Sequence, residues 1–134
     1  MTQGETTTGG PLVMLVEDFR DTRAMMRQML EFQGCRVVEA ANGQEAIELS
    51  QRGRLDLVLM DLNMPVLDGF NATLRIREYE PTRDVPVVAV TAYDSAESRA
   101  AAGAVGCCDY VVKPLDLDNL SMLLKRLLPQ RGSH

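Results

Sequence analysis

Short runs of consecutive hydrophobic residues alternate along the chain with longer segments in which hydrophobic residues recur every three or four positions. Runs of about four to eight such residues predict strands that are buried on both faces, and the wider spacing predicts amphipathic helices. The sequence predicts strands at residues 12–16, 35–40, 55–60, 86–90 and 109–112. It predicts helices at residues 21–33, 44–51, 70–77, 95–105 and 117–128.

Turn-forming and capping residues separate these segments. Gly34 and Gly106 each follow a predicted helix and are typical helix stops. Asp94 followed by Glu97 resembles a capping box, which predicts the start of the fourth helix. Asp68 is interpreted as a turn former rather than as a metal ligand, because it directly precedes a glycine.

The alternation of strands and helices predicts the fold class. Strands separated by helices indicate an α/β fold, in which helices cover both faces of a parallel sheet. We expect the flavodoxin-like doubly wound class, (βα)5, with a five-stranded sheet of order 2-1-3-4-5. In this class ligands bind beyond the carboxyl ends of the strands, so the residues that follow each strand are the candidates for function.

Composition narrows the possible functions. The chain has 134 residues, the length of one domain, and a net charge of −5 from 14 Lys and Arg against 19 Asp and Glu. This balance argues against direct nucleic-acid binding, which needs a basic patch. We expect a cytoplasmic protein without membrane contact, because no run approaches the roughly 20 apolar residues of a membrane span and the first residues of the chain are polar.

Cys35, Cys107 and Cys108 are expected to be buried, and no function is expected for the last two.

The two ends of the chain differ in character from its centre. Residues 1–11 are rich in threonine and glycine and are expected to form a flexible leader. Residues 12–128 are expected to form the domain, and residues 129–134 a tail whose last four residues, RGSH, resemble the beginning of an expression tag. It stays open whether the native protein stands alone or carries a further domain.

Polar residues follow four of the five predicted strands. Glu17 and Asp18 follow the first strand, Asp61 the third, Thr91 the fourth and Lys113 the fifth. Clustered carboxylates repel one another unless a cation lies between them. Oxygen ligands favour Mg²⁺, which usually binds one or two carboxylates together with a phosphate oxygen. The pattern therefore predicts a magnesium site that receives a phosphoryl group.

Asp61 is the candidate nucleophile at this site. A carboxylate needs no general base to attack phosphorus, so no catalytic histidine is required. Phosphoryl transfer depends mainly on positioning and charge neutralisation, which Mg²⁺ and Lys113 would supply. The hydroxyl of Thr91 could then donate to a phosphoryl oxygen, an interaction that exists only after modification.

Four motifs at the predicted strand ends occur in a familiar order. They are Glu17-Asp18, DLNMPVLDG at residues 61–69, VTA at residues 90–92 and YVVKP at residues 110–114. Together they resemble the receiver domain of two-component response regulators, and the similarity extends from Leu12 to about Leu128. One acidic pair would be weak evidence, whereas all four motifs at successive strand ends are specific.

The resemblance implies roles for the acidic residues. Asp61 matches the phosphoacceptor of the family. Asp18 matches the carboxylate that contacts Mg²⁺ directly, and Glu17 the one that acts largely through a bound water. Asn63 matches the position whose backbone carbonyl completes the metal site, which would also accept Mn²⁺.

The resemblance also implies a switch. Lys113 matches the lysine that pairs with the acceptor and then with its phosphate, and its bond to Pro114 is expected to be cis. Thr91 and Tyr110 match the pair that moves on activation, with the tyrosine as the residue that partners recognise. The output would be protein contact through the fourth helix, fifth strand and fifth helix.

The implied partners are a histidine kinase or histidine phosphotransfer protein as donor, and a downstream protein or attached output domain. The chain would be a monomer or a phosphorylation-dependent dimer. It would not be an enzyme proper, because it would act only on its own phosphoryl group, with slow autodephosphorylation. Neither the cognate kinase nor the output pathway follows from the sequence.

Two features of this chain suggest further hypotheses. Tyr93 lies two residues after Thr91, so its ring would stand at the mouth of the site and, together with Asn63, set the lifetime of the phosphorylated state. Gly103 weakens the alanine-rich fourth helix, because glycine costs roughly 1 kcal/mol in a helix interior relative to alanine. The fourth helix is therefore the candidate mobile element.

Three other functions fit the sequence less well. An aspartate-nucleophile phosphohydrolase would use a second carboxylate two residues after the nucleophile as general acid, and Asn63 stands there. A flavodoxin-like cofactor binder would need a phosphate-binding loop after the first strand, where Glu17 and Asp18 would repel phosphate. A receiver that is not phosphorylated is disfavoured, because none of the key positions is missing.

Overall fold

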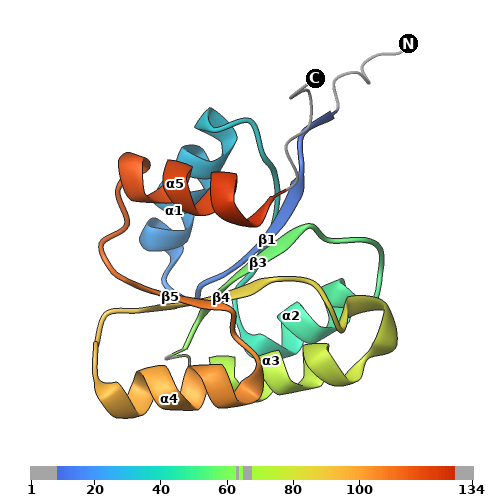
Figure 1. The fold of residues 1–134 in the computed structure, drawn as a ribbon. Coiled ribbons are helices and arrows are strands. Elements are labelled where there is room, and N and C mark those ends of the chain that lie inside the picture. Colours follow the sequence, from blue (N-terminus) through green and yellow to red (C-terminus); the bar gives the residue numbers. More distant parts are fainter. Residues whose placement is uncertain (1–8, 63, 65–67, 129–134) are drawn as a thin grey trace.

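The computed structural model describes residues 9–62, 64 and 68–128 (Figure 1). In these residues five strands alternate with five α-helices, and a short 3₁₀ helix, η2, which the sequence did not predict, follows α3. The strands are β1 Leu12–Val16, β2 Arg36–Ala40, β3 Leu57–Asp61, β4 Val87–Thr91 and β5 Asp109–Val112. The helices are α1 Arg20–Phe32, α2 Gly43–Ser50, α3 Gly69–Glu78, η2 Glu80–Thr82, α4 Ala96–Val105 and α5 Leu117–Leu127.

The strands form one parallel sheet of order β2-β1-β3-β4-β5. This order confirms the predicted doubly wound class. Val16 pairs with Met60, one residue before Asp61, and Asp61 pairs with Val90, one residue before Thr91. The carboxyl ends of the strands therefore meet at one edge of the sheet.

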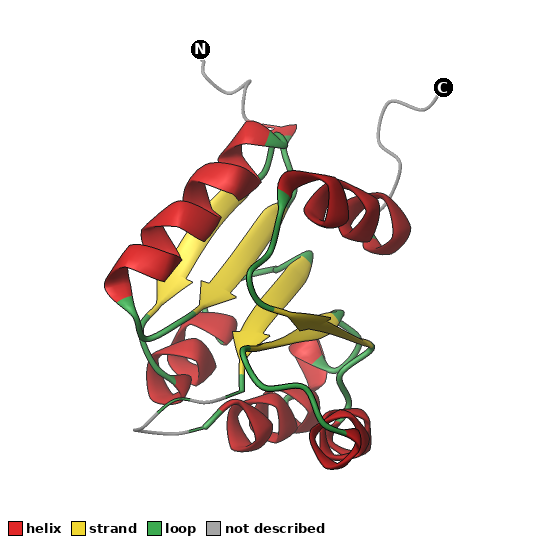
Figure 2. Ribbon diagram, turned by 90° about the vertical axis from the view of Figure 1, so that its left-hand side faces the viewer, coloured by secondary structure: helices red, strands yellow, loops and turns green. Residues whose placement is uncertain are grey.

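Helices cover both faces of the sheet. Figure 1 shows α1 and α5 on one face and α2, α3 and α4 on the other, and Figure 2 shows the strands between these two layers. Alternate residues of β1 belong to different hydrophobic clusters: Val13 and Leu15 pack with residues of α1 and α5, and Met14 and Val16 with residues of α2 and α3. Because both faces of the three inner strands are buried, β1, β3 and β4 are nearly all hydrophobic.

The start of α4 differs from the prediction. Ser95, not Asp94, is the N-cap, and its side chain accepts a hydrogen bond from the N–H of Ser98 at 3.0 Å. Asp94 instead forms an ion pair with Arg99. The predicted capping box is therefore wrong, because a serine hydroxyl one residue further along caps the helix and leaves the aspartate free for a longer-range contact.

The cysteines are not all buried. Cys35 is buried, Cys107 is half-buried and Cys108 is exposed, so the prediction is wrong for Cys108. Cys108 directly precedes β5, an edge strand, and its backbone N–H donates to the carbonyl of Val87 while its side chain meets solvent. Burial raises the pKa of the Cys35 thiol.

Two residues that precede β1 make hydrogen bonds to the rest of the domain. Gly10 and Pro11, which the sequence assigns to the leader, accept hydrogen bonds from the side chain and the backbone N–H of Arg36. Ordered contacts therefore begin before β1.

Among the helices of the described part of the chain, none is long and apolar enough to cross a membrane.

Candidate functional site

Three carboxylates meet at the carboxyl ends of β1 and β3. Glu17, Asp18 and Asp61 each offer an oxygen, and these oxygens all lie within 4.8 Å of one another. Asp61 is the last residue of β3, and Glu17 directly follows β1. Glu17 and Asp61 are only 2% and 4% exposed, whereas Asp18 is exposed. The parallel sheet has thus brought together the acidic residues that the sequence predicted.

Lys113 lies among these carboxylates. Its Nζ is 2.6 Å from Oε1 of Glu17 and 3.5 Å from Oδ2 of Asp61. Burial alone would lower the pKa of Lys113, but its hydrogen bond to Glu17 and the charge of Asp61 raise that pKa above its ordinary value. Lys113 is therefore protonated at neutral pH. The cis bond between Lys113 and Pro114 that the resemblance implied is present.

Every polar atom of Glu17, the residue that follows β1, forms a hydrogen bond. The backbone N–H of Glu17 donates to the carbonyl of Ala40 in β2 at 3.0 Å, and its own carbonyl accepts from Nη1 of Arg23 at 2.9 Å. Its carboxylate accepts from Lys113 and from the backbone N–H of Phe19 at 3.0 Å. These bonds fix the orientation of Glu17 despite its burial.

Gly69 brings the start of α3 against the end of β3. A Cβ atom on this residue would lie 2.3 Å from the backbone oxygen of Asp61 and 2.7 Å from the Cα of Leu62, so only glycine fits. Asp68 caps α3 by accepting a hydrogen bond from the N–H of Asn71 at 2.9 Å. Asp68 thus fixes the start of α3. The predicted carbonyl ligand, Asn63, lies outside the described residues.

A hydrogen-bond relay leads from β4 to β5. Thr91 is 1% exposed, and its Oγ1 accepts from the N–H of Tyr93 at 3.1 Å and donates to the Tyr93 carbonyl at 3.3 Å. The hydroxyl of Tyr110 donates to that same carbonyl at 3.1 Å. The side chains of Thr91 and Tyr110 therefore share one acceptor. The ring of Tyr93 is 75% exposed at this edge of the sheet.

Arg99 joins this relay, and the sequence did not point to it. Its guanidinium carbon lies 4.5 Å from the centre of the Tyr110 ring, and two of its nitrogens donate to the carboxylate of Asp94 at 2.8 and 3.1 Å. A guanidinium over an aromatic ring is a cation–π contact. The only signal in the sequence was the pair of opposite charges, which the expected capping role of Asp94 concealed.

The charges of the cluster suit a divalent cation. Three carboxylates and one ammonium carry a formal charge of −2, and oxygens are the ligands that Mg²⁺ prefers. A phosphoryl oxygen would complete such a site, because Mg²⁺ is usually held by one or two carboxylates together with phosphate. The residues present therefore fit a magnesium ion beside a carboxylate nucleophile.

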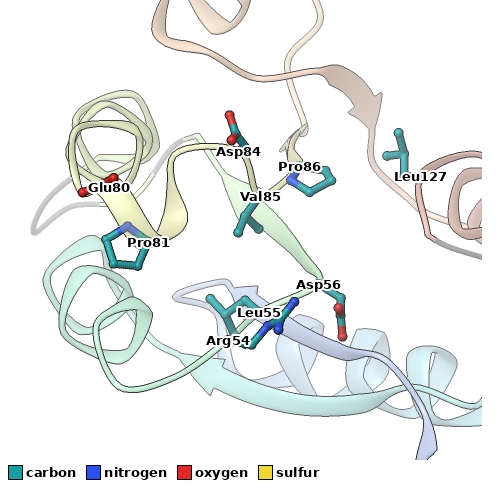
Figure 3. A pocket seen from close by; sticks show the side chains of 9 residues that line it. All are labelled: Arg54, Leu55, Asp56, Glu80, Pro81, Asp84, Val85, Pro86 and Leu127. Atoms are coloured by element: carbon teal, nitrogen blue, oxygen red, sulfur yellow. The ribbon is translucent and has the colours of Figure 1, made fainter.

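A pocket of about 340 Å³ lies away from this cluster (Figure 3). Its lining includes Leu55 and Asp56, which precede β3, and Val85 and Pro86, which precede β4. The pocket thus lies at the amino ends of the strands, opposite to the acidic cluster. None of the predicted site residues lines it.

Comparison with known proteins identifies the family. The family model described as "Response regulator receiver domain" matches residues 13–125. The transcriptional regulatory protein PrrA of Mycobacterium tuberculosis is 36% identical over 129 residues, which cover 96% of this chain and 54% of PrrA. The chain therefore spans about half the length of this curated relative.

Two solved structures resemble the chain closely. The receiver domain of the sensor histidine kinase PA1611 from Pseudomonas aeruginosa, with a magnesium ion coordinated in its active-site cleft, has a TM-score of 0.84 and 37% identity, covering 89% of this chain and 98% of that one. A chain in the co-crystal structure of the Saccharomyces cerevisiae phosphotransfer protein Ypd1 and the receiver domain of its response regulator Ssk1 has a TM-score of 0.82 and 33% identity, with 88% of each chain covered. With the sheet order and the acidic cluster, these matches show that the chain belongs to the receiver domain family of two-component response regulators.

Proposed function

We propose that this chain is a signalling switch that is activated when Asp61 accepts a phosphoryl group. The observation that carries the proposal is the cluster of three carboxylates and Lys113 at the carboxyl ends of the strands. Asp18 and Asp61 would bind Mg²⁺ directly, Glu17 through water, and the backbone carbonyl of Asn63 would complete the site. Mn²⁺ has similar ligand preferences and would substitute for Mg²⁺.

The transfer step follows from the positions of the side chains. A carboxylate oxygen of Asp61 attacks the phosphorus of a phosphohistidine, the P–N bond breaks, and the leaving imidazole takes up a proton. A metal ion held by Asp18 and Asp61 would supply charge neutralisation on the phosphoryl oxygens. Lys113 is already 3.5 Å from Asp61 and can pair with the transferred phosphoryl group. Its raised pKa keeps it cationic for this contact.

The relay between Thr91 and Tyr110 couples the modification to the surface. A phosphoryl group on Asp61 would offer the Thr91 hydroxyl a charged acceptor in place of the Tyr93 carbonyl, and charged acceptors form stronger hydrogen bonds. Release of that carbonyl changes the environment of Tyr110 and of Arg99 stacked on it. We infer that the output surface is formed by α4 and β5 together with α5, whose Arg126 pairs with Asp109 at the start of β5.

The expected partners are a phosphoryl donor and a protein or domain that responds to the switch. The donor is a histidine kinase or a histidine phosphotransfer protein of the cytoplasm, as the similarity to the receiver domain of Ssk1 supports. Phe19, which directly follows Asp18 and is 61% exposed, offers apolar surface beside the site for such a donor. A downstream protein or an attached output domain responds to the switch, and the receiver itself does not bind nucleic acid.

Labelling with radioactive acetyl phosphate tests the proposal. The wild-type chain is expected to incorporate label with Mg²⁺ and to lose this ability when EDTA removes the metal. It is expected to release only its own phosphoryl group, so sustained hydrolysis of small phosphoesters would favour a phosphohydrolase instead. Labelling that is equal with and without metal would refute the magnesium site.

Tyr93→Ala is expected to shorten the life of the phosphorylated state severalfold. The backbone N–H of Tyr93 donates to Oγ1 of Thr91, and the exposed side chain of Tyr93 begins at this point of the site, so we expect its ring to shield the phosphoryl group from water. The measurement is the autodephosphorylation rate after removal of acetyl phosphate. Phe32→Ala, which removes an exposed ring at the far end of α1, is the control. Equal rates for wild type and Tyr93→Ala would exclude this role.

Helix α4 is expected to respond most to phosphorylation. Ala102 is the only buried residue of this helix, so little apolar burial opposes its movement. Gly103 weakens it further by roughly 1 kcal/mol relative to alanine. Amide hydrogen exchange is expected to change in α4 on binding of beryllofluoride, a phosphoryl mimic, and to stay constant in α2, which buries four residues. Unchanged exchange in α4 would contradict its assignment as the mobile element.

A further inference from the structure

A network of ion pairs lies beside the acidic cluster but outside it. Nε of Arg23, in α1, donates to Oε1 of Glu39, in β2, at 2.8 Å. Arg27 pairs with the other carboxylate oxygen of Glu39 and, through its Nε, with Glu31 at 2.9 Å. The hydrogen bond from Arg27, with a smaller contribution from Arg23, lowers the pKa of Glu39. Glu39 is therefore ionised at neutral pH.

Only one member of the network reaches the site. Nη1 of Arg23 donates to the backbone carbonyl of Glu17 at 2.9 Å, and the Arg23 side chain is 18% exposed. The two arginines and two glutamates of the network balance one another, so Arg23 can approach the site without an uncompensated charge that would repel a cation. It thus delivers a hydrogen bond to the backbone that carries Glu17 and Asp18.

The contact between Arg23 and the Glu17 carbonyl lies where the chain leaves β1 and presents two of the three carboxylates. The N–H of Glu17 is held by β2, through the carbonyl of Ala40, and its carbonyl is held by α1, through Arg23. Asp18 follows at once, and α1 begins after Phe19, an N-cap without a side-chain hydrogen bond. Arg23 is therefore the side chain that ties the peptide between Glu17 and Asp18 to the rest of the fold.

We propose that Arg23 is a positioning residue for the metal site, which it serves by fixing the peptide that joins Glu17 to Asp18. The inference rests on the proposed magnesium site. Mg²⁺ demands near-ideal octahedral geometry, whereas Ca²⁺ tolerates irregular sites, so loss of Arg23 should weaken Mg²⁺ binding more than Ca²⁺ binding.

The test is a titration of the full chain with Mg²⁺ and with Ca²⁺, followed by amide chemical shifts. Arg23→Ala is expected to raise the dissociation constant for Mg²⁺ about tenfold, because the variant loses part of the free energy of one charged hydrogen bond. The dissociation constant for Ca²⁺ is expected to rise by a smaller factor. Arg27→Ala is the matched control, because it removes a pairing to Glu39 but no contact with Glu17. Arg23→Lys, which keeps the charge, is expected to recover part of the affinity.

The outcomes separate this inference from the proposed function. Equal Mg²⁺ affinity in wild type and Arg23→Ala, or equal losses in Arg23→Ala and Arg27→Ala, would overturn the positioning role while leaving the metal site intact. A parallel loss of Mg²⁺ and Ca²⁺ affinity would also overturn it. If Arg23→Ala does not fold, the same comparison is made with Arg23→Lys against Arg27→Lys. A wild-type chain that binds no Mg²⁺ would overturn both the inference and the proposed function.

Discussion

Asp61→Asn is expected to abolish Mg²⁺-dependent labelling by acetyl phosphate. The amide is a poor nucleophile and removes one of the three carboxylates that form the metal site. The fold should survive, because asparagine has nearly the same shape and the change removes one buried negative charge from a cluster of net charge −2. The measurement is label incorporated per chain after a fixed time with Mg²⁺.

Asp84→Asn is the matched control for this variant. Asp84 is exposed and lines the pocket at the amino ends of the strands, opposite to the acidic cluster (Figure 3). It is expected to label like wild type. Labelling of Asp61→Asn at the wild-type level would show that another residue receives the phosphoryl group.

Lys113→Gln is expected to destabilise the metal-free protein by about 3 kcal/mol, the cost of leaving buried carboxylates without their cation. Glu17 would lose its 2.6 Å ion pair while it stays buried beside Asp61. The same loss of positive charge should tighten Mg²⁺ binding, so Mg²⁺ is expected to stabilise the variant more than wild type. Urea unfolding in EDTA and in Mg²⁺ measures both effects.

Lys125→Gln removes the same charge from an exposed position on α5 and serves as the control. It is expected to change the free energy of unfolding little, with no dependence on Mg²⁺. If Lys113→Gln were as stable as wild type in EDTA, Lys113 would not be the cation that balances the cluster.

Much of the fold could be predicted because its strands are buried on both faces. The range of β1 was predicted as it occurs, and the order of the sheet is the one expected for the flavodoxin-like class, which the alternation of strands with helices indicated. The start of β3 was placed two residues too early, because hydrophobicity alone does not show where pairing begins. Asp56, which lies before that strand, instead accepts a hydrogen bond from the N–H of Leu12 at 2.8 Å.

The acidic cluster was also predictable, for a topological reason. A parallel sheet places all its carboxyl ends at one edge, so Glu17, Asp61 and Lys113 lie along that edge although they are far apart in sequence, and the long side chain of Lys113 reaches both carboxylates. The contacts of Arg23 and Arg99 were not predictable. A guanidinium that reaches a backbone carbonyl or an aromatic ring leaves no periodic signal, and only the three-dimensional arrangement shows which acceptor it finds.

The most direct test of the account is to identify the phosphorylated residue. The chain is phosphorylated with acetyl phosphate and Mg²⁺, the acyl phosphate is reduced with borohydride, and the peptides are sequenced by mass spectrometry. Homoserine is expected at position 61 and unreduced aspartate at position 18. Reduction at another aspartate, or none at Asp61 in a chain that carries label, would contradict it.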